Sequence, residues 1–108
     1  MIKKNTEMFS SESADLILDK LIEFAQKKQL GAKVAPNKYK LVLRHLNGES
    51  MDLEMNVKIL KDGDKNCIEV NRIQGDCLGF YENFNILKEY LGDIVDETQW
   101  SSFINHYS

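Results

Sequence analysis

The stretch "MDLEMNVKI", residues 51–59, alternates apolar and polar side chains without a break. The apolar residues occupy its odd-numbered positions, and Asp, Glu, Asn and Lys occupy the even-numbered ones. Because successive side chains of a β-strand point to opposite faces, this strand would bury one face and leave the other in water. A sheet with one wet face is typically antiparallel, so the stretch predicts an antiparallel sheet.

Further strand patterns lie on both sides of this stretch. Residues 38–46, "KYKLVLRHL", alternate in the same way, and the Asn47-Gly48 pair that follows is a strong hairpin signal. Asp62-Gly63-Asp64 marks the next turn, after which "CIEVNRI", residues 67–73, is predicted as a strand. Two shorter strands are expected at residues 7–9 and 32–35, the second broken by Pro36-Asn37.

Apolar residues with helical spacing predict two helices. The first stripe consists of Ala14, Ile17, Leu18, Leu21, Phe24 and Ala25, and the second of Phe80, Phe84, Leu87, Leu91 and Ile94. Ser10, Ser11 and Ser13 offer N-caps to the first helix, Lys27 and Lys28 suit its C-terminal end, and Gly31 is a natural C′ residue. A last short helix, capped by Asp96 or Thr98, would carry the stripe Trp100, Phe103, Ile104 and Tyr107.

This order predicts an α+β fold with the sequence β-α-β-β-β-β-α. We expect a curved antiparallel sheet of four to five strands, with two helices packed on one face and a short C-terminal helix. The chain of 108 residues would form a single domain, residues 1–108, in which 1–6 and 96–108 are peripheral. The terminal aromatic stripe would pack on the domain's own core, with docking to a partner as the alternative.

Composition narrows the classes of function. The hydrophobic content of 43% fits a globular protein, and the net charge of −3 argues against nucleic-acid binding. No apolar run has the length of a membrane span, and the N-terminus lacks the apolar block of a signal peptide. Cys67 and Cys77 lack metal-ligand spacing, so we expect reduced thiols in a cytosolic or nuclear protein. The opening Met-Ile-Lys-Lys is compatible with a piece of a larger protein.

The segment "NRIQGDCLGF", residues 71–80, has three interpretations: a phosphate loop, a redox site or a plain turn. It lacks the further glycines and the Lys-Ser/Thr of a P-loop. Cys77 at a helix start can have a lowered pKa, but without a nearby resolving cysteine a structural thiol is favoured. We therefore favour a strand-to-helix turn, in which Gly75 stands where a side chain does not fit and Asp76 lies near the helix N-terminus.

Neither histidine indicates a catalytic or metal site. His45 follows a strand pattern, His106 lies near the C-terminus, and no carboxylate or thiolate partners stand at matching positions. We expect no cofactor, no metal and no catalysis within this chain. The local concentration of basic side chains indicates either an anionic-lipid or phosphorylated-partner patch, or simply a solvated face, which is favoured. These residues are Lys27, Lys28, Lys33, Lys38, Lys40 and Arg44.

The order of these segments resembles the kinase-associated-1 domain, a module at the C-terminus of many Ser/Thr protein kinases. The pieces are "MFSSESADLILDKLIEFAQKKQLGAKV", "YKLVL", "MDLEMNVKIL" and "IEVNRIQGDCLGFYENFNILKEYLGDIV". Where the family has Arg-x-Ser-x-Gly-Asp-x-Leu-x-Phe or a related motif, this chain has Arg72, Ile73, Gly75, Asp76, Leu78 and Phe80. It departs from the pattern at Gln74 and Gly79, where members often have Ser and Glu.

The ending "LGDIV" and the Trp-containing tail are most similar to the DNA-damage checkpoint effector kinases. The microtubule-affinity, septin-associated and calcineurin-B-like-interacting kinases are alternative branches of the family to which the chain could be similar. The resemblance implies a nuclear and cytoplasmic regulatory module that binds the kinase catalytic domain in cis and inhibits it until linker phosphorylation releases it. Other signalling proteins are possible partners. Membrane targeting through anionic phospholipid is the alternative function. By motif match, the contact residues would be Arg72, Gly75, Asp76 and Phe80. Arg72 and Asp76 would supply polar contacts or fix the turn, and Phe80 would anchor the last helix. Maintenance of the fold is the alternative role of Gly75, Asp76 and Phe80.

Overall fold

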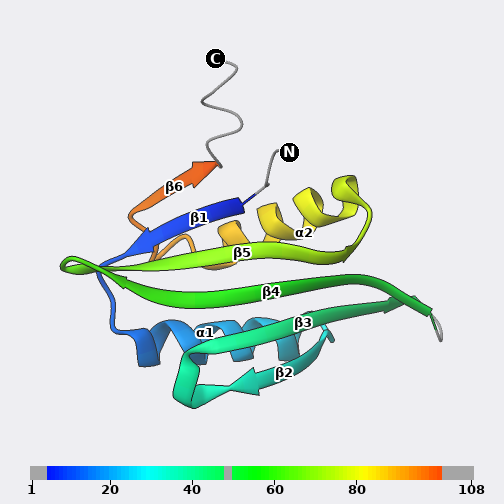
Figure 1. Ribbon diagram of the computed structural model, residues 1–108, viewed down its shortest axis with the longest axis horizontal. Helices are drawn as coiled ribbons and strands as arrows, with labels where there is room; N and C mark the ends of the chain where they lie inside the picture. The colour runs from blue at the N-terminus through cyan, green and yellow to red at the C-terminus, as the bar shows by residue number, and fades with distance from the viewer. Residues whose placement is uncertain (1–4, 48–49, 101–108) are drawn as a thin grey trace.

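The computed structural model describes residues 5–47 and 50–100, which form one open antiparallel sheet and two helices (Figure 1). The strands are β1 (Asn5–Ser10), β2 (Gly31–Ala35), β3 (Lys40–Asn47), β4 (Ser50–Asp62), β5 (Lys65–Gly75) and β6 (Glu97–Trp100). The helices are α1 (Ala14–Lys27) and α2 (Cys77–Tyr90), and a short 3-10 turn, η1 (Pro36–Lys38), joins β2 to β3. The strands lie side by side in the order β2-β3-β4-β5-β1-β6. The predicted α+β class and the order β-α-β-β-β-β-α are confirmed, and β6 adds a sixth strand to the four to five that we expected.

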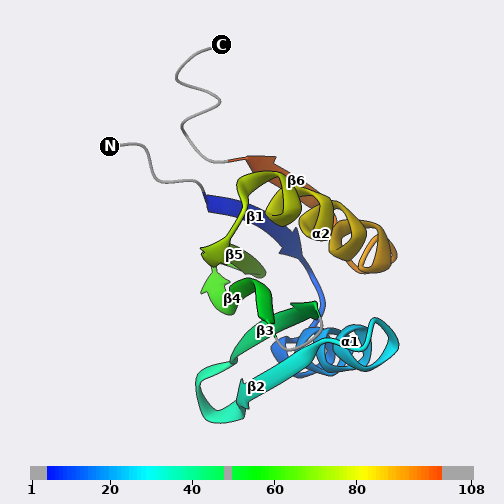
Figure 2. The ribbon, with the colours of Figure 1, turned by 90° about the vertical axis from the view of Figure 1, so that its right-hand side faces the viewer.

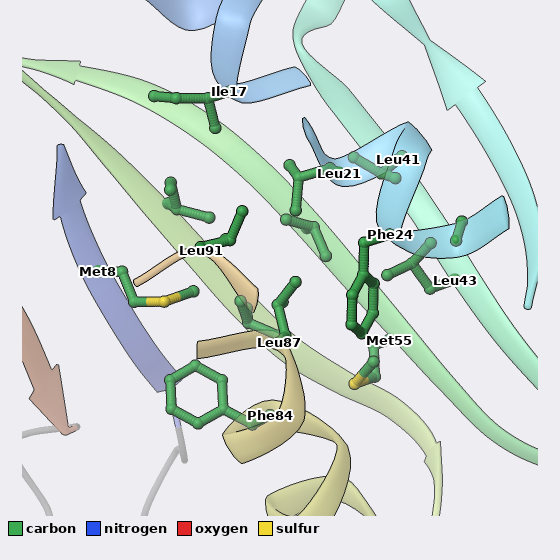
Figure 3. Close-up of a cluster of buried hydrophobic side chains, with 14 of the residues drawn as sticks. Met8, Ile17, Leu21, Phe24, Leu41, Leu43, Met55, Phe84, Leu87 and Leu91 are labelled. Atoms are coloured by element: carbon green, nitrogen blue, oxygen red, sulfur yellow. The ribbon is translucent and has the colours of Figure 1, made fainter. Parts of the chain in front are cut away.

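Both helices cover the same face of the sheet, as Figure 2 shows. Helix α1 packs against β2 and β4, and α2 packs against β4 and β5. The core lies between these layers, where side chains from both helices meet Met8 and the inward residues of β3, β4 and β5 (Figure 3). The alternation in β4 is borne out, because Leu53, Met55, Val57 and Ile59 are buried. Within residues 5–47 and 50–100 no helix covers the other face of the sheet, which we call the outer face.

Helix α1 begins and ends through hydrogen bonds to otherwise unpaired backbone groups. The Ser13 hydroxyl accepts from the Leu16 amide at 3.2 Å, which is N-capping. At the other end the Leu30 amide donates to the Ala25 carbonyl at 2.8 Å, while Gln29 adopts a left-handed conformation with φ 56°. Gln29 therefore holds the C′ position that we predicted for Gly31, which is instead the first residue of β2.

Tyr90, the last residue of α2, ties the two helices together. Its hydroxyl donates to a carboxylate oxygen of Glu23, and its ring lies 5.3 Å from that of Phe24 and 5.5 Å from the Lys27 ammonium. The hydrogen bond to Glu23 raises the pKa of Tyr90 to about 12 and lowers the pKa of the Glu23 carboxyl. The second apolar stripe continues beyond the helix, since Leu91 and Ile94 are buried although α2 ends at Tyr90.

The C-terminal segment differs from the prediction. Residues 97–100 form β6, which pairs with β1, so the short helix expected after Asp96 or Thr98 does not start there. The Asp96 amide donates to the Phe9 carbonyl at 2.7 Å and directs the chain along the open edge of β1. Thr6 is buried, so it and residues 97–100 belong to the sheet rather than to the periphery. Phe103, Ile104, His106 and Tyr107 lie outside the described residues.

Two turns were predicted between the central strands. Asp62 pairs with Lys65 across the second turn, where Gly63 has a φ of 64° that suits glycine. Asn47 and Ser50 pair at the first turn, whose residues 48–49 lie outside the described part of the chain. The register between β3, β4 and β5 follows from these connections.

Candidate functional site

The connection from β5 to α2 carries the motif residues. The Asp76 carboxylate caps α2 by accepting from the Gly79 amide at 3.3 Å. Gly75 has a φ of 112°, which is strained for any residue with a side chain. The Arg72 guanidinium donates to the Gly75 carbonyl. Arg72, Gly75 and Asp76 thus shape one turn, as the sequence predicted for the glycine and the aspartate.

A β-bulge places an apolar side chain on this turn. Met55 of β4 pairs with Arg72 and the preceding Glu54 pairs with Gln74, so Ile73 is an extra residue on β5. The Ile73 side chain is 52% exposed, and that of Leu78 in the first turn of α2 is 66% exposed. We name the exposed side chains of Arg72, Ile73, Asp76 and Leu78 the turn surface.

Phe80 does not belong to this surface. It is only 2% exposed, and its ring lies 5.5 Å from that of Tyr81 and 6.4 Å from that of Phe84. A partner cannot reach this ring while the domain keeps this fold. Phe80 therefore anchors α2 in the core, as one interpretation of the motif expected, and the expected direct contact with a partner needs correction.

A cavity of about 250 Å³ lies next to the capped end of α2. Its lining residues are His45, Leu53, Asp76, Gly79, Glu82 and Asn83. The two carboxylates at its rim favour a cationic group over an anion. This polarity disfavours the phosphate-loop interpretation of the segment. Within residues 5–47 and 50–100, no group of His, Cys, Asp and Glu is arranged to hold a metal ion.

The two cysteines are free thiols at different places. Cys67 is buried on the outer face, where its thiol donates to a Glu7 carboxylate oxygen at 3.5 Å. Burial, followed by the charge of Glu7, raises the pKa of the Cys67 thiol to about 12, which makes it a poor nucleophile at neutral pH. Cys77 is the half-buried first residue of α2.

The six basic residues do not form one patch. Lys27 lies against Tyr90 on the helix side, Lys28 ends α1, and Arg44 pairs with Glu54 at 2.9 Å on the outer face. The remaining three, Lys33, Lys38 and Lys40, line a common depression of about 270 Å³ at the β2–β3 edge. The structure thus brings together half of the set that the sequence singled out.

Sequence reasoning missed Ile73 and Leu78 as surface residues. A signal was present for Leu78, which stands two positions before Phe80 and so falls off the buried stripe of α2. No comparable signal marks Ile73, because a bulge depends on the register of the neighbouring strand. Both lie within the segment that resembles the kinase-associated-1 motif.

Comparison with known proteins does not assign the chain to a family. No protein-family model matches this chain, and no curated protein matches it significantly. In the part of the chain that the structure describes, neither helix is long and apolar enough to cross a membrane.

Proposed function

We propose that this domain is the regulatory module of a Ser/Thr protein kinase of the DNA-damage checkpoint type, and that it binds and restrains the kinase catalytic domain. The observation that carries the proposal is the turn surface. Two large apolar side chains, Ile73 and Leu78, are exposed on the same strand-to-helix connection as Arg72 and Asp76, within the motif by which the chain resembles kinase-associated-1 domains. Apolar groups exposed together at a polar rim are typical of protein docking sites.

The geometry suits a contact of moderate strength. Full burial of an Ile or Leu side chain is worth about 1.5–3 kcal/mol, so docking these half-exposed side chains would contribute on the order of 1 kcal/mol each. The acidic cavity beside the turn would accept a cationic side chain of the partner. A restraint of this size can be reversed, since the charge added by phosphorylation of a linker shifts such an equilibrium.

The test is an inhibition assay in trans with matched variants. The isolated domain is added to the catalytic domain of a checkpoint effector kinase, and initial rates of peptide phosphorylation are measured. We expect saturable inhibition that weakens roughly tenfold when Ile73 and Leu78 are both replaced by Asp. The control is Leu60→Asp, because Leu60 on β4 is 44% exposed but far from the turn surface. On the same strand, Leu53 is the partner of Gly75, and it lies about 23 Å from Leu60 at about 3.3 Å per residue.

Two results would contradict the proposal. One is no inhibition at concentrations where the domain is folded and monomeric. The other is inhibition that Leu60→Asp weakens as much as the paired Ile73 and Leu78 changes, because the turn surface would then have no special role. Circular dichroism of each variant separates loss of binding from loss of fold.

The anionic-lipid alternative has a narrower basis than the sequence indicated. Only Lys33, Lys38 and Lys40 of the six basic residues share one depression. The most exposed large apolar side chains of the described residues, among them Leu78 and Ile73, are not part of this depression, whose own apolar lining is small or partly buried.

A further inference from the structure

Strand β2 forms an open edge of the sheet. It pairs with β3 and stands last in the strand order, so within the described residues its other side meets no strand. In an antiparallel pair, every second residue of the outer strand points its amide and carbonyl away from its partner. Residues 31–35 therefore present unpaired backbone groups at this edge, which is the template that an added strand requires.

Three lysines gather at the same edge. Lys33 on β2, Lys38 on η1 and Lys40 on β3 surround the depression of about 270 Å³. Its other lining residues are apolar, and no carboxylate belongs to them. A depression of this size is large enough for an acidic side chain to enter.

Among the described residues, these lysines lack a carboxylate partner of their own. Lys40 stands directly opposite Lys58 in the register of β3 and β4, where like charges repel, whereas Lys58 also faces Glu69 on β5. No described carboxylate forms an ion pair with Lys33, Lys38 or Lys40, whereas Arg44 on the same strand is paired with Glu54. One lysine on an edge strand is a common device against aggregation, but it does not account for three around a depression.

The loop that carries Lys38 is fixed in place. Tyr39 adopts a left-handed conformation with φ 49°, its carbonyl accepts from the Ile59 amide at 2.9 Å, and its hydroxyl donates to the Asp15 carboxylate at 2.9 Å. These contacts tie Tyr39, the residue that follows η1, to both α1 and β4. A preformed site loses less conformational entropy on binding than a flexible one.

We propose that the β2 edge binds an extended acidic peptide, which adds to the sheet as a further strand. Alternate side chains of such a strand point to the outer face, so acidic residues at every second position would lie next to Lys33, while Lys40 on β3 would reach them across its β2 partner Ala35. This edge offers both unpaired backbone groups and unpaired ammonium groups, and an extended acidic peptide can bind both. A membrane would interact with the ammonium groups but would leave the backbone groups without partners. The site is separate from the turn surface and stands whether or not the kinase proposal does.

The probe is a short fluorescent peptide in which Glu alternates with Thr, measured by anisotropy. We expect saturable binding that weakens at least roughly tenfold when alternate peptide nitrogens are methylated, since methylation removes donors but keeps the charge. A peptide of the same composition with its Glu residues in one block should also bind more weakly. Lys33→Ala with Lys40→Ala should reduce affinity severalfold, while Lys61→Ala, which changes an exposed lysine of β4 outside the depression, should not.

Several outcomes would overturn this inference. Equal binding of the alternating, blocked and methylated peptides would mean that only charge is recognised. Binding to phosphatidylserine vesicles that depends on Lys33 and Lys40, together with no peptide binding, would make the edge a membrane site. Amide hydrogen exchange gives an independent readout, because a paired strand must slow exchange within residues 31–35, and unchanged exchange at saturation contradicts strand addition.

Discussion

Replacing Phe80 by Ala is expected to remove a large share of the stability of this domain. The ring is 2% exposed and packs against the rings of Phe84 and Tyr81. Truncating a buried Phe to Ala costs about 3–5 kcal/mol, in which the lost transfer of the ring and the cavity left behind both contribute. A domain of 108 residues has a total stability of roughly 5–16 kcal/mol at about 0.05–0.15 kcal/mol per residue. The variant would therefore lose between a fifth and most of its free energy of unfolding.

Urea denaturation followed by circular dichroism measures this loss. With an m-value of about 1.5 kcal/mol/M, a loss of 3–5 kcal/mol lowers the midpoint by roughly 2–3 M. The control is Leu78→Ala two positions earlier, which should change stability by less than about 0.5 kcal/mol because this side chain is 66% exposed. If Phe80→Ala costs less than about 1 kcal/mol, its placement in the core is wrong.

Three further predictions concern the motif turn and the buried thiol. Asp76→Ala should lower the melting temperature by about 4–8 °C through the loss of about 1 kcal/mol of capping, whereas Asp76→Asn, which still caps, should change it little. Gly75→Ala should cost roughly 1–3 kcal/mol in urea denaturation, because alanine is strained at φ 112°; a neutral substitution would contradict that conformation. The pKa of the Cys67 thiol is about 12 in the folded protein, whereas an ordinary cysteine thiol, as in the unfolded chain, has a pKa of 9.0. The folded state therefore holds this proton more tightly. Its contribution to stability is full below pH 9 and is lost as the pH rises towards 12, and Cys67→Ser should make the pH dependence of the unfolding midpoint shallower in that window.

The strands and helices could be predicted because each has one buried face. The period-two pattern of residues 51–59 and the helical stripe that begins at Ala14 follow directly from which side chains meet the core. The turn at Gly75 and Asp76 was predicted on the same grounds, since glycine and a capping carboxylate have few alternative uses at a strand-to-helix junction. These features depend on local chemistry and on a single buried face.

The remaining features depend on contacts between distant segments. Strand β6 forms because the Asp96 amide meets the Phe9 carbonyl, and an apolar stripe in the sequence could not distinguish that pairing from a helix. Gln29 takes the left-handed position because the helix ends one turn before Gly31. The exposure of Ile73 follows from a bulge whose register is set by β4. Alternation along β5 alone could not have located it.

The arrangement of the basic residues also depends on contacts between distant segments. Six lysine and arginine residues lie within eighteen positions of the chain, from Lys27 to Arg44, and sequence proximity suggested one patch. Lys27 lies on the helix side against Tyr90 and Arg44 is paired with Glu54, so only Lys33, Lys38 and Lys40 line a common depression. Neighbours in sequence became neighbours in space only where the β2–η1–β3 connection folds back on itself.

Whether the turn surface docks on the kinase is tested by a chemical-shift map of the ¹⁵N-labelled domain titrated with an unlabelled checkpoint effector kinase catalytic domain. If it does, the perturbed amides cluster between Arg72 and Leu78 and along the exposed side of the first turns of α2. The amides of residues 31–35 should stay unchanged. Perturbations confined to the β2–β3 edge, or none at saturating kinase, would contradict the assignment of the turn surface as the site of restraint.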